Sequence, residues 1–143
     1  MPNEHACAAE VSPLVLSAHS FIYPASVLSV HDGHTLRVTV TLRPGLVETW
    51  NVRLARINCP ELNSPDPSVS AAANAAKDFT KLVTNTPLVV QWLHTDNYGG
   101  RVDCELWYLD RNVGDYRNLS DSLLKVGLAV PYRDAGDKGK TKT

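Results

Sequence analysis

The chain has 143 residues and a mass of 15.7 kDa, which suits a single domain. Its apolar fraction is 43% and its charged fraction is 20%, so it is not a collagen, a coiled coil or a fully disordered chain. Its 14 basic and 15 acidic side chains give a formal net charge of −1. A sequence-independent nucleic-acid binder usually carries a large positive excess, so this charge balance argues against one.

The predicted elements begin after a segment without sustained periodicity, which we expect to form an N-terminal arm over residues 1–20. Residues 21–42 are β-rich, and apolar residues stand at every second position from Leu36 to Leu42, as in a half-buried strand. Between the two β-rich runs, residues 31–34 form a predicted turn in which Gly33 supplies a permissive backbone. Further strands are predicted at residues 49–57, 87–92 and 101–109, and helices at residues 69–82 and about 120–126.

Capping residues indicate where the two helices begin and end. Asp66 or Ser68 caps the first helix, and Asn118 or Ser120 caps the second. Gly127 ends the second helix. The apolar face predicted for the first helix consists of Ala72, Ala76, Phe79 and Val83.

This order of elements predicts a mainly β domain with two or three helices (α+β). Five strands with a helix between the third and the fourth fit a five-stranded Greek-key barrel of the OB type, a fold that binds oligonucleotides or oligosaccharides. No repeat or low-complexity linker divides the chain. We therefore predict one domain over residues 21–132 and a flexible C-terminal tail over residues 133–143.

The cysteines and the apolar runs predict a cytoplasmic protein. Cys7, Cys59 and Cys104 are odd in number and match no zinc-binding spacing, which favours reduced thiols. No apolar run approaches the roughly 18 residues of a membrane span. The N-terminal segment also lacks the basic residues of a secretion signal.

Four short motifs stand in register with the predicted elements. They are VHDGHT at residues 30–35, RLARINCPE at 53–61, DNYGGR at 96–101, and the helix from Asn118 to Ala129 followed by Pro131 and Tyr132. In this order and spacing the set resembles the staphylococcal-nuclease-like (thermonuclease) family over residues 22–132. The resemblance implies an OB-fold endonuclease, a phosphodiesterase that cleaves DNA or RNA with one Ca²⁺.

The resemblance also implies roles for individual residues. The two arginines that clamp the phosphate fall on Arg53 and, allowing for one inserted glycine, on Arg101. Glu61 matches the glutamate that orients or activates the attacking water. Tyr98 and Tyr132 match positions that bind the substrate.

The metal-ligand positions of the family fall on His34, Asn58 and Cys59, and Asp32 is a further candidate metal ligand beside them. The family has carboxylates where this chain has His34 and Asn58, whereas Cys59 replaces a threonine that offers only its backbone carbonyl. Ca²⁺ prefers anionic oxygen ligands, and a unit charge pair at ~4 Å near a surface is worth about 4 kcal/mol. The substitutions therefore disfavour Ca²⁺. Together with Glu61 the remaining donors suit Mn²⁺ or Zn²⁺ better. The alternative is that the protein uses no metal.

Several of these residues also have structural interpretations. Asp32 and His34 are common turn residues, Glu61 is equally a surface charge, and Arg56 reads as a solvated strand residue. Trp50, Trp92 and Trp107 read as core or barrel-surface residues.

Three functions therefore remain. The first is a nuclease with an altered or weakened metal site, and the second is an inactive barrel that binds nucleic acid. The third is a structural or protein-interaction module. We expect DNA or RNA as the partner, no membrane association, and a monomer by default.

Overall fold

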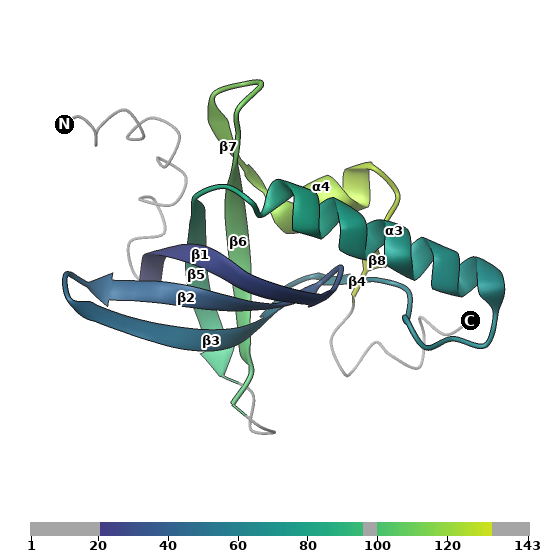
Figure 1. Ribbon diagram of the computed structural model, residues 1–143, viewed down its shortest axis with the longest axis horizontal. Coiled ribbons are helices and arrows are strands. Elements are labelled where there is room, and N and C mark those ends of the chain that lie inside the picture. The colour runs from purple at the N-terminus through teal and green to yellow at the C-terminus, as the bar shows by residue number, and fades with distance from the viewer. Residues whose placement is uncertain (1–20, 96–99, 133–143) are drawn as a thin grey trace.

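The computed structural model describes residues 21–95 and 100–132. The predicted N-terminal arm, the predicted C-terminal tail, Cys7 and Tyr98 lie outside these residues. The elements are β1 (Phe21–Asp32), β2 (Thr35–Arg43), β3 (Leu46–Leu54), β4 (Ile57–Asn58), α3 (Pro67–Val83), β5 (Leu88–Thr95), β6 (Val102–Asp110), β7 (Asp115–Asn118), α4 (Leu119–Lys125) and β8 (Val130–Pro131) (Figure 1).

Five of these strands close into a barrel, as the sequence predicts. β1 pairs antiparallel with β2 and β5, β2 pairs with β3, and β5 pairs with β6. A parallel pairing of β3 with β6 then joins the two ends of the sheet. Helix α3 follows the third barrel strand and packs against β1, with further contacts to β6, while α4 packs against β6 and β7 (Figure 1). The α+β barrel is therefore confirmed.

The core follows from the period-two alternation of the strands, because every second side chain points into the barrel. Its fully buried aliphatic residues on the barrel strands include Leu36, Val38, Val40, Val52, Leu54, Val90 and Leu106. On α3 the buried residues are Ala73, Ala76 and Thr80. Ala72, which we predicted on the apolar face, is exposed, since Ala73 occupies the contact with the barrel.

The capping alternatives are settled by hydrogen bonds. Asp66 caps α3, where its carboxylate accepts the Ser68 N–H at 2.9 Å. Asn118 caps α4, where its side-chain oxygen accepts the Asp121 N–H at 3.0 Å. Gly127 follows α4 with φ of 78°, a left-handed conformation that glycine adopts without strain.

The third strand begins and ends three residues earlier than predicted. β3 ends at Leu54, and the chain turns at Arg56, which has φ of 73°, before the short β4 pairs with β8. The sequence carries a sign of this turn: Val52 and Leu54 alternate in one phase, whereas the next buried residue, Ile57, falls in the opposite phase. A continuous strand would have put Ile57 on the outer face.

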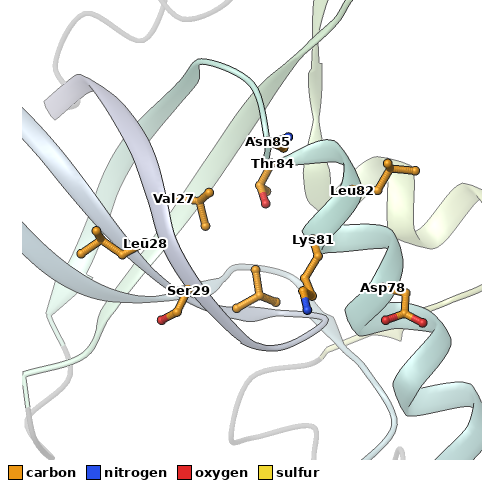
Figure 2. A pocket seen from close by; sticks show the side chains of 9 residues that line it. Val27, Leu28, Ser29, Asp78, Lys81, Leu82, Thr84 and Asn85 are labelled. Atoms are coloured by element: carbon orange, nitrogen blue, oxygen red, sulfur yellow. The ribbon is translucent and has the colours of Figure 1, made fainter.

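A hollow of about 480 Å³ separates β1 from the C-terminal half of α3 (Figure 2). Residues 27–30 line its strand side, where the β1–β2 register shifts between Val27 and Ser29. Lys81 and Leu82 contribute to its helix side. None of the predicted site residues lines this hollow. No helix in the described parts of the chain has the length and apolar character to cross a membrane.

Candidate functional site

Strand register brings the segments of several predicted site residues together at one end of the barrel. Thr35 of β2 pairs with Arg53 of β3, and the Leu54 N–H donates to the carbonyl of His34 at 2.8 Å. On the other side of β3, Val52 pairs with Val102, the first residue of β6, so Arg101 directly precedes β6 beside the same stretch of β3. The β1–β2 turn, the end of β3 and the start of β6 therefore meet here.

Arg53 is held by neutral acceptors. Its Nη1 donates to the Leu54 carbonyl at 3.1 Å, and its Nη2 donates to the Ile57 carbonyl at 3.2 Å and to Asn58 Oδ1 at 2.5 Å. The ring of Tyr132 lies against the guanidinium, with Cζ 4.7 Å from the ring centroid, a cation–π contact. These contacts orient the guanidinium and leave its positive charge without a carboxylate partner among the described residues.

Asp32 and His34 form the turn between β1 and β2. Asp32 Oδ1 accepts the His34 N–H at 3.0 Å and lies 3.2 Å from His34 Nδ1, without the angles of a second hydrogen bond. Burial lowers the pKa of His34 below its ordinary 6.5; Asp32 raises it, and the charges of Arg53 and Arg101 lower it further. The imidazole is therefore neutral at pH 7, and both arginines lie close enough to act on it.

Gly33 is required for a different reason from the one we predicted. Its backbone is not in the left-handed region, but a Cβ on it would lie 2.7 Å from both Ala76 Cβ and Cys59 Sγ. The buried Thr80 hydroxyl donates to the Gly33 carbonyl at 2.7 Å. The turn is thus clamped directly onto α3, and only a residue without a side chain fits this close approach.

Cys59 packs beneath this turn. Its side chain is buried, and burial raises the pKa of the thiol to about 12. It is therefore a protonated, space-filling group at neutral pH. Cys104, also buried, belongs to the barrel core.

Glu61 belongs to a different segment from the two arginines. It is exposed in the loop after Pro60, and its backbone carbonyl accepts the Ser64 N–H at 3.4 Å. Among the described residues, the hydrogen bonds of the Arg53 guanidinium go to Leu54, Ile57 and Asn58, and none goes to Glu61. Of the three groups expected to converge, the two arginines act on one imidazole, while the glutamate stays a prediction.

The donors at this end of the barrel do not fit Ca²⁺. Among the described residues, Asp32 is the one carboxylate against His34, and the Asn58 oxygen is occupied by the Arg53 guanidinium. A Ca²⁺ ion takes six to eight oxygens, several of them anionic. In the described part of the chain, no group of three or more His, Cys, Asp or Glu side chains is arranged to hold a metal ion.

Arg56 is a residue that the sequence analysis missed. Arg56 is exposed, as predicted, but it lies in a turn and not in a strand. It donates to both carboxylate oxygens of Glu105 (2.6 and 3.0 Å), to Asp121 (2.9 Å) and to Asn118 (3.1 Å). Its carbonyl accepts the Tyr132 N–H at 2.7 Å. The network ties the turn after β3 to β6 and α4 and so positions the segment that holds Arg53.

The closed five-stranded barrel with α3 and α4 is the architecture that the resemblance to nuclease-like proteins leads us to expect. In agreement, the family model of staphylococcal nuclease homologues matches residues 51–143. The match covers more than half of the chain, so the protein belongs to the staphylococcal nuclease homologue family. It includes Arg53, Asn58, Glu61, Arg101 and Tyr132 and begins after the β1–β2 hairpin. No curated protein matches the chain.

Proposed function

We propose that this protein is a nucleic-acid-binding member of the family that holds a backbone phosphate of DNA or RNA with Arg53 and Arg101. We further propose that it lacks the family's Ca²⁺-dependent hydrolysis. The observation that carries the proposal is the hydrogen bond from Arg53 to Asn58 Oδ1. It places a guanidinium on an oxygen that, in the family resemblance, belongs to a metal-binding carboxylate.

The charges favour an anion at this position. Arg53 and Arg101 both lower the pKa of His34, and Asp32 opposes them. A divalent cation would meet two like charges and one carboxylate. A phosphate, in contrast, matches the planar donors of a guanidinium. Tyr132 supports this arrangement because its ring contact restricts Arg53 to one orientation.

The experiment measures binding of fluorescent single-stranded DNA and RNA by anisotropy over a series of salt concentrations. Arg53→Gln and Arg101→Gln should each weaken binding and reduce the slope of log K against log salt by about 1. Arg111→Gln, at an exposed arginine in the β6–β7 turn, is the matched control and should bind as the parent does. No binding at low salt, or equal loss in the control, would leave the structural or protein-interaction role.

A second candidate, hydrolysis assisted by a softer metal, is favoured by the contact of Asp32 with His34. One carboxylate oxygen and one imidazole nitrogen lie 3.2 Å apart, and Mn²⁺ or Zn²⁺ accept such mixed donors. A cleavage screen across Ca²⁺, Mg²⁺, Mn²⁺ and Zn²⁺ decides between the two. Cleavage that disappears in Glu61→Gln selects the hydrolase, whereas binding without cleavage under any metal selects the binding module.

A further inference from the structure

A second concave site lies on the opposite side of β3 from Arg53. Four aromatic side chains and one leucine from four barrel strands line a cavity of about 260 Å³: Phe21, Tyr23, Leu42, Trp50 and Trp92. Because side chains alternate along a strand, Trp50 shares the inward side of β3 with Val52 and Leu54, whereas Arg53 points away from it. The aromatic cavity is therefore separate from the candidate phosphate site.

The rings stand at right angles to one another. Phe21 meets Trp92 edge to face, with centroids 5.6 Å apart and an interplanar angle of 77°. Tyr23 meets Trp50 in the same way, at 5.7 Å and 90°. Phe21 is 55% exposed, so the cavity opens to solvent. Perpendicular rings form the walls of a box, an arrangement in which a compact group contacts more than one ring.

A carboxylate lies beside this box. The indole N–H of Trp50 donates to Glu48 Oε1 at 2.9 Å, and the indole N–H of Trp92 donates to the Thr95 hydroxyl at 3.0 Å. Both indole donors are thus already paired, and the two tryptophans offer a ligand their apolar surfaces. Glu48 is exposed and adds one negative charge at the edge of the cavity.

We propose that this aromatic cavity binds a quaternary ammonium group, such as the head group of trimethyllysine or choline. Aromatic faces attract cations, and methylated ammonium groups shed water more readily than a primary ammonium does. The carboxylate of Glu48 complements the positive charge. The cavity is smaller than the roughly 300–1,000 Å³ of most small-molecule sites, so it takes a head group rather than a whole nucleotide, whose phosphates Glu48 would repel.

The test uses the full chain and its tryptophan fluorescence, since Trp50 and Trp92 line the cavity. The ligands are choline, a trimethyllysine peptide, the same peptide with unmodified lysine, and a nucleoside, all at one ionic strength. We expect saturable quenching by the trimethyllysine peptide, by choline or by both, and at least about threefold weaker binding of the unmodified peptide. Comparison of choline with the peptide identifies the source of the ammonium group.

Two variants with matched controls complete the experiment. Glu48→Gln should weaken binding by about threefold to fivefold, whereas Asp78→Asn, which removes a charge from exposed α3, should not. Phe21→Ala should weaken binding further, whereas Leu82→Ala, at a side chain that is 75% exposed, should not. Equal affinity for the two peptides, an unchanged Glu48→Gln, or tighter binding of the nucleoside would overturn the proposal.

Discussion

Two arginines that stand three positions apart, Arg53 and Arg56, have opposite surroundings. Arg53 donates to two backbone carbonyls and to the Asn58 amide, all of them neutral, so the region around it keeps a positive charge. Arg56 lies against two carboxylates, Glu105 and Asp121, which neutralise it. The difference shows that the charge available to a ligand lies at the β1–β2 turn, while the second arginine serves to shape the chain.

Adding carboxylates beside Arg53 should produce the largest change, a gain in Ca²⁺ affinity. In the double variant His34→Asp with Asn58→Asp, carboxylates stand at both substituted ligand positions, and Arg53 gains an anionic neighbour as Arg56 has. Because each added charge near the surface is worth about 4 kcal/mol at ~4 Å, we expect Ca²⁺ affinity to rise by about a hundredfold or more. Calorimetric titration measures this affinity, and phosphate binding should weaken in parallel.

The single variants serve as controls for that experiment. Each adds one carboxylate and should give an intermediate Ca²⁺ affinity. A double variant that still fails to bind Ca²⁺, although its circular dichroism matches that of the parent, would show that charge alone does not account for the altered site.

Substitution of Arg56 tests how much its ion pairs and its positive φ contribute to stability. Arg56→Ala leaves the half-buried Glu105 carboxylate without this partner, and we expect the free energy of unfolding to fall by about 2 kcal/mol. Arg56→Gly loses the same ion pairs but adopts the left-handed conformation at no steric cost, so it should be more stable than Arg56→Ala by about 1 kcal/mol. Urea denaturation measures both values. Equal stability of the two variants would contradict a role for the positive φ.

The smallest expected effect is on pH dependence. The pKa of His34 is below its ordinary value because of burial and of the charges on Arg53, Arg101 and His31, with Asp32 opposing. The folded state therefore binds this proton less readily than the unfolded chain. The resulting stability is fully present above about pH 6.5 and is lost as the pH falls through the lower folded-state pKa.

His34→Gln removes this contribution, so its free energy of unfolding should fall less than that of the parent between about pH 7 and about pH 5. Denaturation at several pH values measures the difference. His94→Gln, at an exposed histidine, is the control and should keep the pH dependence of the parent. A free energy of unfolding that is equally independent of pH in both variants would show that the effect does not come from His34 beside Arg53.

Much of the barrel was predictable because its cause is local. The alternation of Leu36, Val38 and Val40 recurs along β6 and at the end of β3, and burying one face of a strand requires only that pattern. Asp66 and Asn118 were among the predicted caps because a cap bonds backbone two or three residues away.

The sequence by itself therefore determined the five barrel strands to within a few residues, the two helices and the residue types at the candidate site, whereas the short β4, β7 and β8 came only from the tertiary structure. The tertiary structure decided which charges meet: Arg56 reaches Glu105 and Asp121 across 49 and 65 positions of sequence, and Gly33 lies against Ala76 and Cys59. Such contacts depend on how distant segments pack and on which partner each charge finds there. The local sequence pattern does not encode that choice. The charge partners of Arg53 and Arg56 are therefore visible only in the folded barrel.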